Sequence, residues 1–356
     1  MTYKGILMSA SPNRLQFLDA LRGIAVLLVI FAHAAHSRFP IVQVIDANYF
    51  QTGQAGVSLF FLISGYIIPK SLNASPSLKV FWVHRFFRLY PAYWVCLFLV
   101  ILLASAQLFR IQEPLGTVGM AANFTMLQGF VGIKNAVNVF WSLKFEMAFY
   151  FLMTAFAVTG MLKRPFLIFM LYSAGTIALA LGMRLVLHKY FAYGVFNLEL
   201  MLLGWVLAEW HAKRLAGKYA VISVIVGLGT TLIAAYTAFA GRTEELTVGT
   251  LSFVPMANAW LLSTVFFVAT LLTTQQVRWP RVLAWMGTVS YSAYLLHPLV
   301  LELSIHFLPP TAPTVVLEFA ASFAAAWVCF RFIETPCIAY GKKVAPRAQI
   351  APTVRA

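Results

Sequence analysis

Charged residues are scarce in this chain. Asp, Glu, Lys and Arg make up 10% of the 356 residues, and only 11 residues are acidic, whereas an ordinary soluble domain carries roughly 25% charged residues. Hydrophobic residues reach 61% of the chain, so little polar surface is available to face water. The composition therefore excludes a soluble enzyme of one or two domains and predicts a polytopic membrane protein.

Cysteine is also rare. The three cysteines, Cys96, Cys329 and Cys337, are scattered and lack metal-ligand spacing, which argues against a disulfide framework and a zinc site. The formal net charge is +15, but the basic residues stand in short clusters between apolar runs. Because nucleic-acid binding needs a basic face or stripe, nucleic acid is not a predicted partner, and the lipid bilayer is.

Ten apolar segments are candidates for membrane spans, each of which needs about 20 residues. They cover residues 15–35, 55–70, 86–107, 139–159, 166–187, 196–210, 219–240, 250–274, 284–306 and 313–334. Lys and Arg test this count, because they gather in cytoplasmic loops. With the N-terminus inside, 18 of the 26 lie on the inner side and 6 on the outer side. We therefore predict an all-α bundle of about ten spans with both termini in the cytoplasm.

One domain is predicted, because the chain shows no internal repeat and no linker. The transmembrane domain covers 1–342, and the polar tail over 343–356 is predicted to be disordered. The first apolar segment also has features of a signal peptide, namely a basic start and small residues after the apolar run. Asp19 and Arg22 within that run favour a retained span instead, as does the charge alternation, which nine spans would break.

Polar side chains in the first span form one face. Asp19, Arg22, His33 and His36 lie in this segment, and Arg22 and His33 are eleven residues apart, which is three helical turns. A charge inside a membrane helix costs roughly 2.5 kcal/mol or more, so such a group needs a partner or a task. Glu146 lies about seven residues into the fourth span, which predicts a depth similar to that of His33. The two could form an acid/base pair.

Simpler interpretations of these residues stay open. His33 could be a helix-end histidine in the outer interface, and Glu146 could form an ion pair with Lys144 or Arg38. We interpret His36 as an exposed residue. The H-A-A-H spacing lacks a third ligand nearby, so no metal site is predicted.

Two arginines stand where the third span enters the membrane. Arg85 and Arg88 are one helical turn apart in V-H-R-F-F-R-L-Y-P-A-Y-W. Guanidinium groups bind phosphate oxygens in a bidentate manner, and Tyr90 and Trp94 can stack on a ring or anchor the interface. The alternative is an ordinary cluster of positive charge at the inner surface.

Aromatic and ionisable residues also occur in the last two spans. Tyr291, Tyr294 and His297 share one helix face, and a histidine followed by proline in mid-membrane suggests a cavity lining. A packed aromatic stripe is enough to explain the two tyrosines. Arg331 and Glu334 are three residues apart, which predicts a structural ion pair.

These segments together, and in this order, resemble the acyltransferase 3 family of integral membrane acyltransferases. The matching pieces extend from residue 17 to about residue 300, with R-F-I-E-T-P near the C-terminus fitting the same pattern. They are F-L-D-A-L-R-G-I-A-V with the later His33, F-F-L-I-S-G-Y, R-F-F-R-L-Y-P, F-W-S-L-K-F-E-M-A-F-Y and S-Y-S-A-Y-L-L-H-P.

The resemblance implies a ten-helix protein of the bacterial inner membrane. Such a protein moves an acyl group, commonly acetyl, from an acyl-CoA to a hydroxyl of a carbohydrate or glycoconjugate. Acetyl-CoA or another acyl-CoA is then a co-substrate, with no permanently bound cofactor. Some relatives carry an appended hydrolase-like domain, and the short tail predicts none here. The oligomeric state, the acyl group and the acceptor stay open.

The resemblance also implies roles for single residues. The essential first-span residues of the family correspond to Arg22 and His33, and its basic motif corresponds to Arg85 and Arg88. Its Trp-Ser-Leu…Glu motif corresponds to three residues of the fourth span, Trp141, Ser142 and Glu146. The family often has adjacent basic residues where this chain has His84 before Arg85, so the donor contacts can differ.

The expected mechanism brings donor and acceptor from opposite sides of the membrane. Arg85 and Arg88 hold the phosphates of coenzyme A, and Arg22 lies deeper along the path. His33 acts as a general base or as a nucleophile, and both roles need the neutral ring, which Glu146 orients. The rival hypothesis is a transporter or flippase with the same buried polar path.

Overall fold

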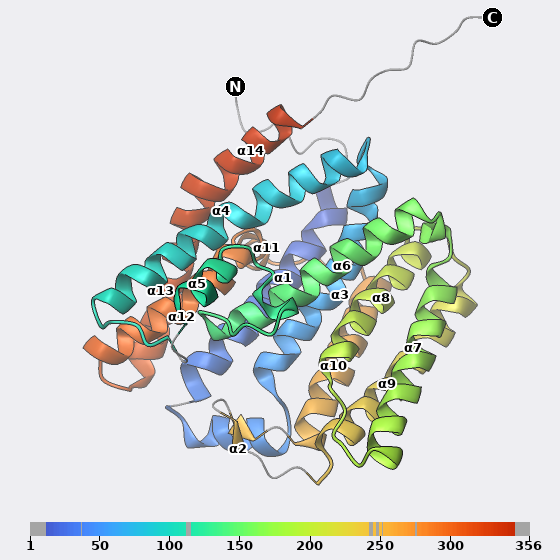
Figure 1. The fold of residues 1–356 in the computed structure, drawn as a ribbon, viewed down its shortest axis with the longest axis horizontal. Coiled ribbons are helices and arrows are strands. Elements are labelled where there is room, and N and C mark those ends of the chain that lie inside the picture. Colours follow the sequence, from blue (N-terminus) through green and yellow to red (C-terminus); the bar gives the residue numbers. More distant parts are fainter. Residues whose placement is uncertain are drawn as a thin grey trace, which may run out of the picture.

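The computed structural model describes residues 12–36, 38–111, 115–241, 245–246, 249–250, 252–274 and 276–345. The described chain is a bundle of long helices (Figure 1). The long helices are α1 (Pro12–His36), α3 (Thr52–Asn73), α4 (Leu78–Ser105), α6 (Trp141–Val158), α7 (Pro165–Leu181), α8 (Gly194–His211), α9 (Gly217–Phe239), α10 (Phe253–Leu272), α12 (Ser290–Phe307) and α13 (Ala312–Cys329).

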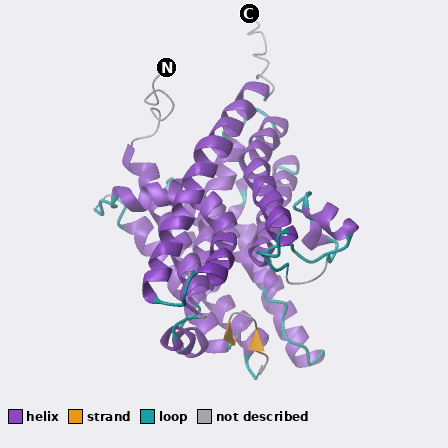
Figure 2. Cartoon of the chain, turned by 90° about the vertical axis from the view of Figure 1, so that its left-hand side faces the viewer, coloured by secondary structure: helices purple, strands orange, loops and turns teal. Residues whose placement is uncertain are grey.

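Short elements connect and extend these helices. They are α2 (Pro40–Asn48), α5 (Thr117–Asn123), α11 (Arg281–Thr288), α14 (Thr335–Val344), the 3-10 turns η2 (Gln128–Phe130), η3 (Asn138–Phe140) and η4 (Met161–Lys163), and the π turns η5 (Gly182–Val186) and η6 (Phe330–Glu334). Two strands, β1 (Glu245–Leu246) and β2 (Gly249–Thr250), form an antiparallel hairpin near α2. Figure 2 shows this hairpin at one end of the bundle, which we call the α2 end.

The predicted all-α fold is confirmed, with helices at all ten predicted positions. Eight helical stretches of the described chain are long and apolar enough to cross a membrane. The remaining two positions are α8 and the α11–α12 segment, whose hydropathy is lower. In α8 nearly every residue from Phe196 to Ala208 is buried by neighbouring helices, so this helix has little contact with lipid.

Both described ends of the chain lie at the same end of the bundle, opposite α2, which we call the α14 end (Figure 1). This agrees with an even number of crossings, while the cytoplasmic location of that end stays a prediction. The helix α14 continues to Val344, two residues into the predicted tail 343–356. The rest of that tail, from residue 346, lies outside the described residues.

The first helix lies inside the bundle, as a retained span requires. Leu21, Val26 and Ile30 on α1 are fully buried. The helices α1 and α11 approach closely because residue 287 of α11 is a glycine. A Cβ atom at Gly287 would lie 1.7 Å from the carbonyl oxygen of Asp19 on α1. Small residues of this kind let membrane helices approach at backbone distance. The polar residues of α1 are therefore held at fixed positions relative to α11 and α12.

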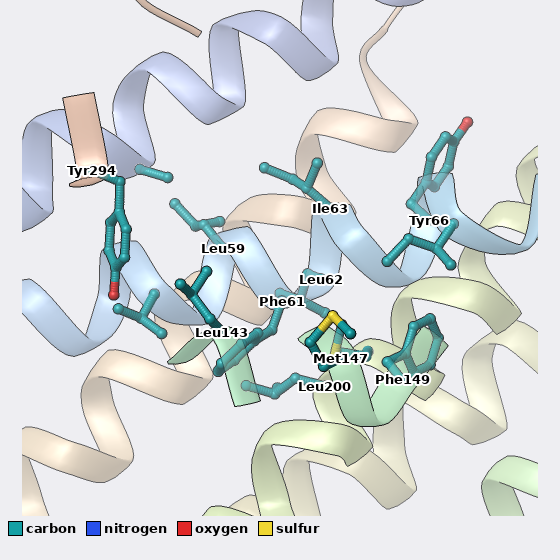
Figure 3. Packing of buried hydrophobic residues seen from close by; sticks show 14 of the residues in the cluster. Leu59, Phe61, Leu62, Ile63, Tyr66, Leu143, Met147, Phe149, Leu200 and Tyr294 are labelled. Carbon is teal, nitrogen blue, oxygen red and sulfur yellow. The ribbon is translucent and has the colours of Figure 1, made fainter. Parts of the chain in front are cut away.

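A second close contact joins α3 to α8. A Cβ atom at Gly65 would lie 1.8 Å from the carbonyl oxygen of Met201, which no side chain can accommodate without a backbone shift. Beside this contact, apolar side chains of α3 pack against α6 and α8. Figure 3 shows this part of the core, with Leu59, Phe61, Leu62, Ile63, Tyr66, Leu143, Met147, Phe149 and Leu200. The packing fixes α6, which carries Glu146, against α3.

Candidate active site

His33 lies near the α2 end of α1, and its ring orientation is fixed by the backbone. Its Nδ1 atom is 2.8 Å from the carbonyl oxygen of Val29. Because a carbonyl can only accept a hydrogen bond, this contact places the proton of the neutral ring on Nδ1 and leaves a lone pair on Nε2. The expected orienting contact with Glu146 is not made. The peptide carbonyl one turn earlier takes that role.

A second histidine stands beside His33. The rings of His33 and His297 lie edge to face, with centroids 5.1 Å apart. His297 is fully buried, and its Nδ1 atom donates to the carbonyl oxygen of Ala293 over 3.1 Å. Its Nε2 atom has no hydrogen-bond partner. Two imidazoles from α1 and α12, each with a lone pair on Nε2, therefore lie side by side in the bundle interior.

His33 lines a cavity of about 310 Å³ near the α2 end, which we call the His33 cavity. Its wall comes from α1, from α2 and the start of α3, from η3 and α6, and from α12. The lining residues are Val29, Ala32, His33, Asp46, Gln51, Gly53, Gln54, Val57, Asn138, Val139, Trp141, Tyr193 and Tyr294. Of the predicted site residues, Trp141 and Tyr294 thus line the same cavity as His33.

Asp46 on α2 is a buried carboxylate of this cavity that sequence reasoning missed. Its Oδ1 atom accepts hydrogen bonds from the backbone N–H and the hydroxyl of Thr52, at 3.0 and 2.8 Å. Its Oδ2 atom is 3.2 Å from Nδ1 of His36. Our interpretation of His36 as an exposed residue was wrong, since its side chain is only 15% exposed.

A smaller cavity of about 70 Å³ continues toward the α14 end, and we call it the Glu146 cavity. Glu146, Ser142, Tyr291 and Ser64 contribute to its lining, and it shares Tyr294 with the His33 cavity. The hydroxyl groups of Ser142 and Tyr294 are 2.8 Å apart and form the partition between the two spaces. Tyr291, Tyr294 and Ser142, which are among the predicted site residues, thus line a cavity, whereas His297, for which a cavity lining was predicted, lines neither of the two.

Glu146 and His33, which were predicted to lie at similar depth and to form an acid/base pair, line different cavities. Glu146 accepts a hydrogen bond from Tyr150 over 2.5 Å and lies within electrostatic range of Arg22. The prediction placed Glu146 about seven residues into the fourth span. Trp141, the first residue of α6, lines the His33 cavity, and Glu146, five residues further along α6, lines the Glu146 cavity.

Ionisable groups from α1, α4 and α6 lie within electrostatic range of one another beside the Glu146 cavity. Arg22 donates to Asp19 over 3.4 Å, and both side chains are only partly buried by the protein. Arg22 also interacts electrostatically with Arg88, Glu146 and Arg85. The predicted basic motif is thus brought together with the predicted first-span arginine, although 63 residues separate Arg22 from Arg85 in the sequence. We call Arg22, Arg85 and Arg88 the arginine cluster.

Two contacts fix the position of Arg85 in this cluster. Its Nη2 atom donates to the hydroxyl of Ser71 over 2.7 Å, and its guanidinium carbon lies 5.7 Å from the centre of the Tyr150 ring.

The predicted ion pair between Arg331 and Glu334 was wrong. Arg331 is exposed, while Glu334 points inward and accepts a hydrogen bond from Ser292.

Tyr90 and Trp94 hold a loop. The Tyr90 hydroxyl donates to the carbonyl of Thr125 over 2.7 Å, and the Trp94 indole N–H donates to the carbonyl of Phe124 over 2.9 Å. The segment after α5 is thereby fixed against α4. The partners lie 30 to 35 residues away in the sequence, which is why spacing alone did not predict these contacts. Donor binding by the two rings stays a prediction.

The fold and the site together define a polytopic helical membrane protein with polar and ionisable groups in its interior. The arginine cluster interacts electrostatically with Glu146, which lines the Glu146 cavity, and the Tyr294–Ser142 partition lies between this cavity and the His33 cavity. Multi-spanning membrane enzymes and transporters both belong to this class. A sequence model of the acyltransferase 3 family, described as an acyltransferase domain, matches residues 15–333. The chain belongs to this family.

Curated relatives carry names of the same kind. Peptidoglycan O-acetyltransferase OatA of Listeria monocytogenes is 28% identical over 356 residues, covering 90% of this chain and 55% of that protein. O-acetyltransferase OatA of Staphylococcus aureus is 24% identical over 368 residues, covering 92% of this chain and 57% of that protein. The chain thus spans somewhat more than half the length of these relatives. No solved structure matches it.

Proposed function

We propose that the chain is a membrane O-acetyltransferase. It transfers an acetyl group from acetyl-CoA, bound at the α14 end, to a hydroxyl of a cell-wall carbohydrate in the His33 cavity. The observation that carries this proposal is the order of the sites, which we propose form one passage: the arginine cluster lies beside Glu146, the Glu146 cavity follows, and the His33 cavity shares Tyr294 with it. The α2 end then faces the outside of the cell.

The arginine cluster suits the phosphates of coenzyme A. Guanidinium groups form charge-assisted, bidentate hydrogen bonds with phosphate oxygens. Arg88 is half-buried, and among the described residues it has only electrostatic interactions, so its donors are available to a ligand. The slender pantetheine arm can then extend past Glu146 toward the Tyr294–Ser142 partition.

His33 supplies the base for the transfer. Its Nε2 lone pair takes the proton of the acceptor hydroxyl while the oxygen attacks the thioester carbonyl. The C–O bond of the ester forms, the C–S bond breaks, and the proton passes from His33 to the departing thiolate. In a two-step variant Nε2 itself attacks the carbonyl, the C–S bond breaks, and the thiolate departs from an acyl-imidazole. The acceptor oxygen then attacks this acyl group, the N–C bond breaks, and the hydroxyl proton passes to the thiolate.

His297 stabilises the protonated ring of His33 in this scheme. Its buried Nε2 atom is an acceptor without a partner, 5.1 Å away between ring centroids. We expect His297→Phe to lower kcat about tenfold to hundredfold, because one hydrogen bond to a charged group contributes about 1.5–3 kcal/mol. Steady-state kinetics should show unchanged KM values for donor and acceptor.

A conservative variant separates this role from packing. His297→Gln keeps an acceptor atom in the same place and should retain clearly more activity than His297→Phe. Equal losses in both variants, or a loss that appears only in KM, would show that His297 merely fills space.

The acceptor class rests on the relatives. One is named for the O-acetylation of peptidoglycan, which makes a hydroxyl-bearing cell-wall glycan the first acceptor to test. The test is release of free thiol from acetyl-CoA by the purified full chain in lipid nanodiscs, with and without a glycan, together with mass spectrometry of the glycan. The proposal expects glycan-dependent thiol release and a mass increase of one acetyl group. A transporter would bind or move substrate with the thioester left intact.

A further inference from the structure

We infer that the His33 cavity is a binding site for one pyranose ring, recognised by Asp46 and Gln54 and by the aromatic rings of Trp141 and Tyr193. This inference rests on the proposed function and specifies its acceptor. It assigns a role to α2 and to the start of α3, where none of the predicted site residues lies.

Charge distinguishes the His33 cavity from the donor end of the passage. No lysine or arginine occurs among the described residues that line it, and Asp46 contributes a carboxylate. A phosphate group would meet this carboxylate without a compensating cation, so the cavity disfavours coenzyme A and lipid phosphates. A neutral ligand rich in hydroxyl groups has no such penalty, because its O–H groups donate to carboxylate oxygens.

The polar groups that line the cavity can form hydrogen bonds with the hydroxyl groups around a sugar ring. The carboxylate of Asp46 offers about four acceptor positions, of which Thr52 takes two and His36 one. One position is therefore left for a ligand hydroxyl. Asn138 is exposed at the edge of the cavity and adds an amide that can both donate and accept.

Gln54 gives the clearest sign of a ligand. Its side-chain nitrogen is buried and has no hydrogen-bond partner among the described residues, although the residue lines the cavity. A buried polar group without a partner costs about 1–3 kcal/mol, so native proteins rarely retain one without a reason. A ligand oxygen in the cavity would accept this hydrogen bond.

Aromatic rings and cavity size favour one cyclic sugar unit. Trp141 and Tyr193 both line the cavity, and aromatic faces pack well against the C–H face of a pyranose ring. A volume of about 310 Å³ is at the lower end of the roughly 300–1,000 Å³ of small-molecule sites. One ring fits this space and brings a hydroxyl to His33, while the remaining units of a longer glycan extend outside the cavity.

The test measures thiol release from acetyl-CoA against acceptor concentration for the full chain in nanodiscs. The acceptors are methyl β-D-glucopyranoside and glucitol, its open-chain counterpart. We expect saturable transfer to the pyranoside and much weaker transfer to glucitol. Asp46→Asn and Gln54→Leu should each raise the KM for the pyranoside about tenfold, with the donor KM unchanged.

Matched variants separate binding from folding. Gln54→Leu removes a group without a protein partner, so its thermal stability should match that of the wild type. Asn48→Ala changes an exposed residue of the same helix as Asp46, outside the cavity, and should leave the pyranoside KM unchanged.

Each contrary result has a distinct meaning. Unchanged pyranoside KM in both cavity variants, or equal use of glucitol, would overturn the pyranose site and leave the acetyltransferase proposal intact. Transfer to an isolated cell-wall glycan but not to the pyranoside would likewise overturn the single-ring site. Absence of thiol release by the wild type with every acceptor would contradict the proposed function itself.

Discussion

Replacing His33 with Ala should lower acetyl transfer at least about a thousandfold, since a general base contributes roughly 10²–10⁴ in rate and a nucleophile is indispensable. The bundle should assemble normally, because the ring faces a cavity and its only hydrogen bond within the described part of the chain is to the backbone of its own helix. Transfer measured as acetylated product, with thermal unfolding measured alongside, tests both statements.

His306 is a matched control for His33. It is exposed on α12, and its Nδ1 atom contacts the carbonyl of Glu302, one turn earlier, over 2.9 Å. His306→Ala therefore removes the same local contact without touching either cavity, and its activity should equal that of the wild type. Substantial transfer by His33→Ala would remove this residue from the chemistry.

The double variant Arg85→Ala, Arg88→Ala should raise the donor KM at least about a hundredfold. Each charge-assisted hydrogen bond to a phosphate contributes about 1.5–3 kcal/mol, and the double variant removes two sets of donors. The acceptor KM should stay the same, because the arginine cluster lies beyond the Glu146 cavity from the acceptor. Transfer rates over a series of acetyl-CoA concentrations give both constants.

A second double variant controls for the loss of positive charge. Lys163→Ala, Arg164→Ala removes two exposed cations between α6 and α7, on the side predicted to be cytoplasmic. It should leave the donor KM within about twofold of the wild-type value, as expected for exposed charges screened by salt. Equal effects of the two double variants would mean that only the overall surface charge attracts the donor.

Much of the fold followed from apolar runs and from the distribution of Lys and Arg. A membrane helix must satisfy its backbone internally and match the bilayer thickness, so segment length and hydropathy specify it directly. The segments 55–70 and 196–210 were the least certain of these because they are short, and α8 also contains Glu199 and Glu209. Helices around it bury Glu199, so packing decides its position more than lipid does.

The α1 face was predictable for a similar reason. Helical geometry alone places Arg22 and His33 on one side, and the cost of an unpaired charge in the membrane turns that side inward. The partners of these residues were harder to predict. The pairing of His33 with His297 joins α1 to α12, and spacing within one helix contains no information about such contacts.

The segments outside the spans account for most errors. The connection between α4 and α6 folds back against the bundle, held by Tyr90 and Trp94. Glu146, on the helix that follows, lines a different cavity from His33. Asp46 was missed because α2 is only nine residues long and has no span signature. Both errors arise from loops that enter the bundle, where distance from the membrane surface cannot be counted along the sequence.

The central claim is that one passage connects a donor at the α14 end to an acceptor at the α2 end. Proteoliposomes with acetyl-CoA only outside and a cell-wall glycan only inside test it directly. The account predicts acetylated glycan inside and free thiol outside, both abolished by His33→Ala. Product that forms only when donor and acceptor share one compartment would contradict it.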